Sequence, residues 1–117
     1  MEIINCTRHD IIVVDKNGDK IVYKPSGYVA RVMYEQEIVT EVNDIDVVRN
    51  IKGVQKGIPD PEPGKLYIVS AMFACSVNRS DILVPNTSPQ GVIRDEFGNV
   101  VAIKSFITYP KSERVIN

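Results

Sequence analysis

The chain has 117 residues, of which 44% are hydrophobic and 25% are charged, and its formal net charge is −1. This length fits one globular domain that can bury a core without help from disulfides or metals. A net charge this close to zero argues against nonspecific binding to nucleic acid, which depends on many cations.

The N-terminal residues show no basic stretch followed by a long apolar run, so we expect no export signal. No segment approaches the ~20 apolar residues that a membrane-spanning helix needs. Cys6 and Cys75 lie far apart and lack CxxC spacing, which favours two buried thiols over a disulfide. We therefore expect a cytoplasmic protein that does not bind membranes.

The first half of the chain is predicted to form β-hairpins. Asn17 and Gly18 form the strongest short turn signal, because both residues tolerate positive φ. Asn43 and Asp44 are expected to join a second pair of strands. The mixed alternation of apolar and polar residues indicates one buried and one solvated face. The expected strands are residues 11–14, 21–23, 28–33, 37–42 and 45–49.

A connector and a strand–helix–strand unit follow. Residues 52–65 are rich in glycine and proline and predict an extended strap across the surface of the domain. Residues 66–69 and 82–84 read as apolar strands. Between them, Ser70 can cap a short helix over residues 71–77, although the same residues could instead form one long buried strand. Since this segment carries no charge, the helix and its Cys75 are expected to be largely buried.

The last predicted unit is a hairpin of residues 91–94 and 100–103 around Gly98. Its second strand is expected to continue through residues 105–109, and the polar tail 111–117 is expected to be mobile. The predicted fold is therefore a single β-rich α+β domain over residues 1–117. It combines antiparallel hairpins with one short buried helix in a strand–helix–strand unit.

Two groups of residues are candidates for ligand binding. If strands 66–69 and 82–84 are parallel neighbours, their carboxyl ends place Ser70 and the loop 85–90 at one edge of a sheet, where α/β sheets tend to bind ligands. Hydroxyl, amide and guanidinium groups there suit a phosphate or a carboxylate. The alternative interpretation is a plain turn beside a solvated arginine. The residues of this first candidate site are Ser70, Thr87, Ser88, Gln90 and Arg94.

The second candidate combines the hydroxyl of Ser26 with the guanidinium of Arg31, although a hairpin end would need residues of this kind anyway. His9 is the single histidine, and no nucleophile can be assigned to it. Two cysteines and one histidine at unrelated spacings do not predict a zinc site. We expect no catalytic residue, no metal and no cofactor.

Several short motifs resemble a family of small proteins found in bacteriophages, prophages and other mobile elements, and the resemblance spans roughly residues 3–106. This family has no established activity. The resemblance therefore implies that the protein acts inside a host cell, and it implies no mechanism. The motifs are residues 25–27 (Pro-Ser-Gly), 29–32, 61–64, 66–71, 83–85 and 94–95, together with 101–102.

In that setting we expect a non-enzymatic binding protein that captures a small anionic or nucleotide-like ligand, as an antagonist of host antiviral defence. A homo-oligomer would favour ligand capture, because binding pockets can form between copies of the chain. One alternative is a structural or regulatory protein-interaction module, since exposed strand edges can pair with a host or phage protein. A nucleotide hydrolase is the third possibility, and the lack of a metal cluster or a credible base counts against it.

Overall fold

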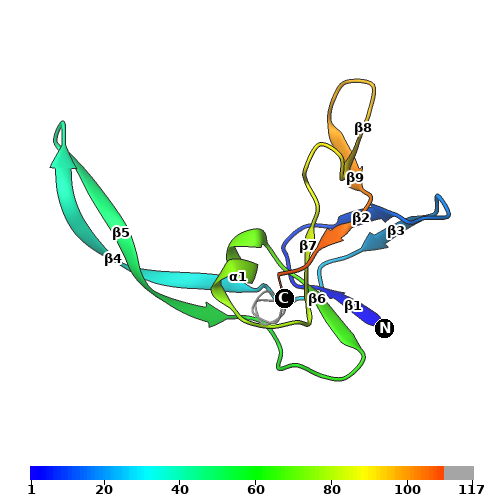
Figure 1. The fold of residues 1–117 in the computed structure, drawn as a ribbon, viewed down its shortest axis with the longest axis horizontal. Coiled ribbons are helices and arrows are strands. Elements are labelled where there is room, and N and C mark those ends of the chain that lie inside the picture. The colour runs from blue at the N-terminus through cyan, green and yellow to red at the C-terminus, as the bar shows by residue number, and fades with distance from the viewer. Residues whose placement is uncertain (110–117) are drawn as a thin grey trace, which may run out of the picture.

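The computed structural model describes residues 1–109, which form a body of two four-stranded sheets and one long two-stranded arm (Figure 1). This confirms a β-rich α+β fold with one short helix. The prediction for the tail 111–117 lies outside the described residues. The elements are β1 (Glu2–Asn5), β2 (Ile11–Val14), β3 (Lys20–Tyr23), β4 (Arg31–Val42), β5 (Ile45–Lys56), β6 (Lys65–Ile68), α1 (Ala71–Ser76), β7 (Ile82–Pro85), β8 (Val92–Arg94), β9 (Val100–Ile103) and β10 (Phe106–Ile107).

The first sheet has the strand order β1-β6-β7-β10. Strands β6 and β7 are parallel and α1 connects them, which confirms the predicted strand–helix–strand unit. The Ser70 hydroxyl accepts a hydrogen bond from the Phe73 N–H (3.2 Å) and so caps the helix. Strand β1, which was not predicted, pairs in parallel with the other side of β6. Strand β10 completes the sheet antiparallel to β7.

The main core lies between this sheet and α1. Val69, Phe73 and Ala74 are 0% exposed there. The helix is only half buried, however, because Met72 is 67% exposed and Cys75 is also exposed. Residues 72 and 75 are three positions apart and share the outer side of a helix that packs with one side only. The prediction that Cys75 is buried is therefore wrong, whereas Cys6 is buried as expected.

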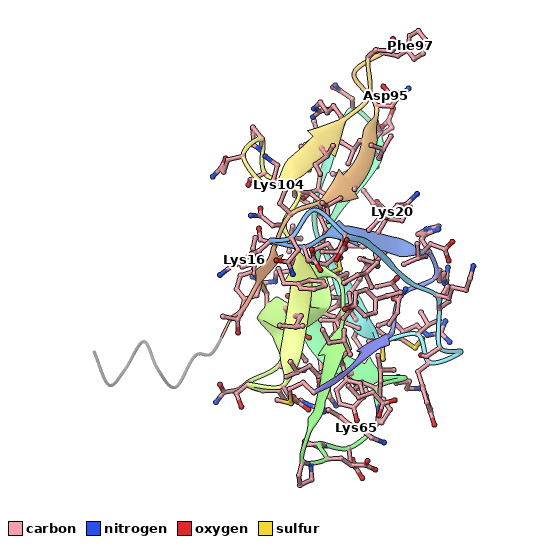
Figure 2. The ribbon with its side chains drawn as sticks, turned by 90° about the vertical axis from the view of Figure 1, so that its right-hand side faces the viewer. Lys16, Lys20, Lys65, Asp95, Phe97 and Lys104 are labelled. Atoms are coloured by element: carbon pink, nitrogen blue, oxygen red, sulfur yellow. The ribbon has the colours of Figure 1, made fainter. Side chains whose placement is uncertain are left out.

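The second sheet has the order β3-β2-β9-β8 and contains both hairpins predicted outside the arm. In each of the two turns, an aspartate carboxylate accepts hydrogen bonds from backbone N–H groups of the turn. Asp15 accepts from Asn17 and Asp19, each at 2.9 Å. Asp95 accepts from Phe97 and Asn99 in the same way. Figure 2 shows Phe97 at the far end of the β8–β9 hairpin.

The predicted continuation of the last strand through residues 105–109 is wrong. The chain leaves the second sheet after β9 and enters the first sheet as β10, beside β7. Asn86 holds this crossing, because its N–H donates to the Ser105 carbonyl (3.0 Å) and its side-chain amide donates to the Ser105 hydroxyl (2.9 Å). The crossing ties the two sheets of the body together.

The arm is the antiparallel pair of β4 and β5, and it extends away from the body (Figure 1). Asn43 and Asp44 form its two-residue turn with φ values of 51° and 63°, as predicted. The strands are longer than predicted. The expected strands 28–33 and 37–42 merge into β4, and β5 runs to Lys56, well into the expected connector. The connector is thus reduced to residues 57–64.

The predicted buried face of these strands is also wrong, because every residue of β5 is exposed. The radius of gyration is 17.1 Å, whereas a compact chain of this length has about 13 Å. The arm begins at Gly57, where a Cβ atom would lie 1.9 Å from the Val29 carbonyl oxygen at a φ of +84°. Only glycine fits this close backbone approach.

Candidate functional site

A cleft of about 260 Å³ lies at the carboxyl ends of β1 and β6, where the arm begins. Three parts of the chain line it, namely residues 6–9, residues 29–31 and Ser70. Ser70 follows β6, and residues 6–9 follow β1. The sequence predicted a site beyond the carboxyl ends of β6 and β7, whereas this cleft lies beyond those of β1 and β6.

Backbone hydrogen bonds hold the three segments together. The Cys6 N–H donates to the Ile68 carbonyl (2.9 Å), which extends the β1–β6 pairing to the floor of the cleft. The Ala30 N–H donates to the Cys6 carbonyl (2.9 Å) from the other side. Ser26 donates to the Asn5 carbonyl through its N–H (3.0 Å) and its hydroxyl (2.7 Å). The end of β1 is thus enclosed between β6 and the segment that leads into the arm.

Asn5 shapes the loop that carries the charged side chains. It is 2% exposed, and each end of its amide makes two hydrogen bonds. Its Nδ2 donates to the carbonyls of His9 (2.7 Å) and Tyr23 (2.8 Å), while its Oδ1 accepts from the N–H (2.9 Å) and hydroxyl (2.7 Å) of Thr7. Because the buried amide is fully satisfied, the loop is fixed and presents Arg8 and His9 in a defined geometry.

The cleft is electropositive. Arg8 and Arg31 line it from opposite segments, and both are exposed, so they are available to a ligand. Among its described lining residues none is acidic. Asp10, the nearest carboxylate in the sequence, is 3.9 Å from the Lys24 ammonium instead. Two guanidinium groups with hydroxyls nearby match the geometry of phosphate or carboxylate oxygens.

The floor of the cleft is chemically inert. Burial raises the pKa of the Cys6 thiol, and this effect outweighs the lowering by the Ser26 hydrogen bond and the Arg79 charge. The thiol therefore stays protonated at neutral pH, and a protonated thiol is a poor nucleophile. The arrangement is suited to holding an anion without forming a covalent bond.

The structure brings together only part of the predicted site residues. Ser70 and Arg31, which belonged to different candidates, line this one cleft, and Ser26 supports it from the side. Thr87 lines a separate hollow. The Ser88 hydroxyl donates to Asn86 (2.6 Å), and Gln90 is exposed on the same loop. Arg94 donates to the Gly98 carbonyl (2.6 Å) within the β8–β9 hairpin.

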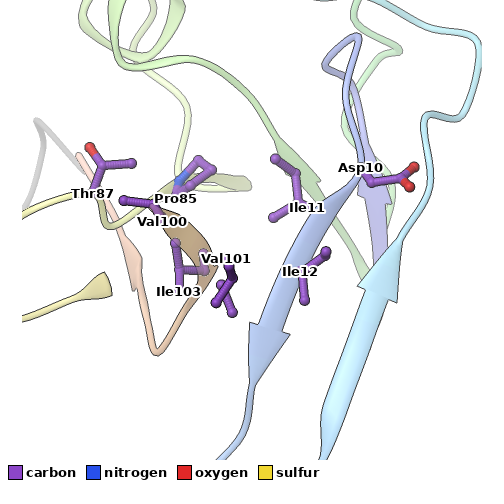
Figure 3. Close-up of a pocket in the computed structure, with 9 residues that line it drawn as sticks. Asp10, Ile11, Ile12, Pro85, Thr87, Val100, Val101 and Ile103 are labelled. Carbon is purple, nitrogen blue, oxygen red and sulfur yellow. The ribbon is translucent and has the colours of Figure 1, made fainter. Parts of the chain in front are cut away.

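The separate hollow lies between the two sheets and also measures about 260 Å³. Figure 3 shows Pro85 and Thr87 on one side of it and Ile11 and Ile12 on the other. Its lining is mainly aliphatic, and its single charged lining residue is Asp10. A carboxylate in an apolar groove repels an anion, so this hollow does not suit the predicted ligand.

Arg8 and His9 were not among the predicted site residues. The sequence did contain a signal for them. Arg8 and His9 follow a short apolar segment, Ile3 and Ile4, that could have been recognised as a strand. Their meeting with Arg31 depends on the parallel pairing of β1 with β6, which joins residues about sixty positions apart and leaves no local pattern in the sequence.

Within residues 1–109, no helix is long and apolar enough to cross a membrane. The same residues contain no group of three histidine, cysteine, aspartate or glutamate side chains that could hold a metal ion. Comparisons with protein-family models, with curated proteins and with solved structures find no match to this chain.

Proposed function

We propose that this protein is a non-enzymatic binding protein that captures a small anionic ligand in the cleft between Arg8 and Arg31. The observation that carries the proposal is the pair of arginines that line one hollow with no acidic lining residue. The Ser70 hydroxyl accepts from the Phe73 N–H and keeps its own proton to donate to an anion.

The size of the cleft narrows the ligand class. At about 260 Å³ it lies just below the usual range of small-molecule pockets. It would hold a phosphate and an attached sugar, while the rest of a nucleotide would extend out of it. In the phage setting that the sequence resemblance implies, the ligand would be a nucleotide signal of host antiviral defence, removed by sequestration in the cytoplasm.

Titration calorimetry with inorganic phosphate, nucleoside monophosphates and cyclic dinucleotides tests this proposal. Arg31→Ala and Arg8→Ala should each weaken binding by about tenfold or more, because each removes a charge-assisted hydrogen bond. Arg94→Ala is the matched control, since this arginine is held in the β8–β9 hairpin by the Gly98 carbonyl. It should leave the affinity unchanged.

The opposite pattern, in which Arg94→Ala weakens binding and Arg31→Ala does not, would move the site to the Thr87–Gln90 loop. Absence of binding to every compound in the panel would remove the capture function. Turnover of any nucleotide by the purified protein would make the protein a hydrolase.

A second candidate function is protein–protein interaction, and the arm favours it. Its apolar side chains include Ile38 and Ile45, which are 64% and 66% exposed. Apolar surface of this kind on a two-stranded ribbon is typical of an interface. The partner could be another protein of the host or the phage, or a second copy of the chain.

A further inference from the structure

The cleft beside the arm has a third nitrogen-bearing side chain in addition to its two arginines. His9 lines it together with Arg8 and Arg31, and none of its described lining residues is acidic. Histidine is the side chain type that can gain a full positive charge between about pH 5 and 8. The lining can therefore carry one positive charge more than the two guanidinium groups provide.

The backbone of His9 is fixed on both sides. Its carbonyl accepts a hydrogen bond from the Asn5 Nδ2 (2.7 Å), and its N–H donates to the Thr7 hydroxyl (3.4 Å). Because the loop is already held by a buried, fully satisfied amide, little backbone freedom is left to lose when a ligand binds. The His9 side chain is exposed, so a ligand can reach it.

The charges around the cleft do not neutralise this set. None of the ion pairs within residues 1–109 involves Arg8, His9 or Arg31. Asp10 follows His9 in the chain, but it does not line this cleft, and its carboxylate is 3.9 Å from the Lys24 ammonium. The positive charges of the lining are therefore left for a ligand.

Phosphate ligands differ in charge and in the number of oxygens that they can offer. A phosphate monoester carries about −1.5 to −2 charges at pH 7 and has three terminal oxygens that accept strong hydrogen bonds. A phosphodiester, such as each linkage of a cyclic dinucleotide, carries a single negative charge and has two such oxygens. Three side chains that can be cationic, with the Ser70 hydroxyl as a further donor, match the monoester.

The floor of the cleft favours the same end of a ligand. Cys6 and Ala30 are 1% and 8% exposed, and the Ala30 N–H donates to the Cys6 carbonyl (2.9 Å). Because the cleft is closed on this side, both substituents of a diester would have to leave through its mouth. A monoester directs one substituent outward and its three terminal oxygens inward.

We propose that the cleft takes the terminal phosphate monoester of a nucleotide, and that the positive charge of His9 selects this monoester over phosphodiesters. The inference rests on the proposed function, since it names the ligand class of the same cleft. Arg8 and Arg31 would hold either kind of phosphate. The second negative charge of the monoester would be balanced by the His9 imidazolium, because a neighbouring negative charge favours the charged form of an imidazole.

Titration calorimetry at pH 7 with a matched pair of ligands tests the inference. Adenosine 5′-monophosphate and its phosphate methyl ester share the base and the sugar, but the ester lacks the second negative charge. The unsubstituted protein should bind the monophosphate about tenfold more tightly than the ester. His9→Gln keeps a hydrogen-bond donor and removes the positive charge. It should weaken monophosphate binding by about tenfold and ester binding by less than about threefold.

Lys16→Gln is the matched control. It also removes one positive charge, but Lys16 is an exposed residue of the β2–β3 turn and does not line the cleft. Because salt screens exposed charges beyond about 8 Å, this variant should change the ratio of the two affinities by less than about twofold. Circular dichroism would verify that both variants fold.

The outcomes separate this inference from the proposed function. Equal affinity for the two ligands, with binding that Arg31→Ala still weakens, would overturn the inference and leave anion capture in place. An equal loss of both affinities in His9→Gln would overturn it as well, because His9 would then contact any phosphate. Absence of binding to both ligands would remove the capture function together with this inference.

Discussion

The body and the arm are stabilised in different ways. In the body, side chains such as Val69, Phe73 and Ala74 are completely buried between sheet and helix. In the arm, all twelve residues of β5 are exposed, and the ribbon is held by its backbone ladder and cross-strand pairs. The free energy of folding of the single chain therefore depends on the body. The apolar residues of the arm are not required by the monomer fold, which is why we interpret them as an interface.

The largest expected effect is on the core of the body. Phe73→Ala removes a side chain that is 0% exposed from the contact between α1 and the sheet. The loss of burial and the resulting cavity should lower the free energy of unfolding by about 3–5 kcal/mol. Urea denaturation followed by circular dichroism would measure it. Ile38→Ala in the arm is the comparison, and at concentrations where the chain is monomeric it should cost less than about 0.5 kcal/mol.

The second effect concerns the ion pair of the body. The Arg79 guanidinium donates two hydrogen bonds to the Asp81 carboxylate, at 2.8 and 2.6 Å, and both side chains are largely covered. Asp81→Asn should cost about 1–2 kcal/mol, because the partly buried guanidinium loses its counter-charge. The exposed Glu37–Arg49 pair of the arm provides the contrast. Breaking it by Glu37→Gln should cost a few tenths of a kcal/mol at most.

The same pair predicts a pH dependence. The hydrogen bonds from Arg79 lower the pKa of the Asp81 carboxyl from its ordinary value of 3.8. A lowered pKa in the folded state adds stability that is present above the ordinary pKa and is lost as the pH falls through the folded value. The unsubstituted protein should therefore lose more stability than Asp81→Asn when the pH is lowered below about 4. Equal acid sensitivity of the two proteins would contradict this assignment.

Removing most of the arm tests the two regions separately. Replacing residues 35–52 by Asn-Gly would join Tyr34 to Gly53 through a two-residue turn, because these two residues are cross-strand partners. The body should keep its cooperative unfolding, and its stability should change by about 1 kcal/mol or less. Thermal unfolding monitored by calorimetry would measure this. Loss of the transition would show that the arm is part of the folding unit, contrary to the comparison above.

Local signals explain which parts of the fold could be predicted from the sequence. Asn43 and Asp44, Gly98 and the capping Ser70 each determine their own turn or helix start, so the hairpins and the strand–helix–strand unit were predicted correctly. The buried face expected for residues 37–49 was wrong. Alternation of apolar and polar residues indicates that the two faces of a strand differ, but it does not show whether another part of the chain covers the apolar face. The alternation in the arm therefore does not by itself place a second layer of the same chain over it.

The candidate site was only partly predictable for a related reason. Arg31 and Ser70 were both chosen for their chemistry, but they were assigned to different sites. What joins them is the parallel pairing of β1 with β6, together with the hydrogen bond from the Ala30 N–H to the Cys6 carbonyl. Contacts of this kind join segments far apart in the chain and leave no spacing signature. Residue type therefore indicated the ligand chemistry, while the fold was needed to bring the residues together.

The smallest expected effect lies at the tip of the arm. Asp44 adopts a φ of 63°, in a turn whose second position strongly prefers glycine. Asp44→Gly should stabilise the turn by less than about 1 kcal/mol, because it removes the steric cost of a side chain in the left-handed region. The amides of Val42 and Ile45 should then exchange with solvent several-fold more slowly, while that of Tyr67 in the body should not change. Asp44→Ala keeps a Cβ atom and should not slow exchange at the tip. Equal slowing in the body would mean that the arm and the body open as one cooperative unit, whereas slowing confined to the tip would show that the arm frays independently and is free to order on a partner.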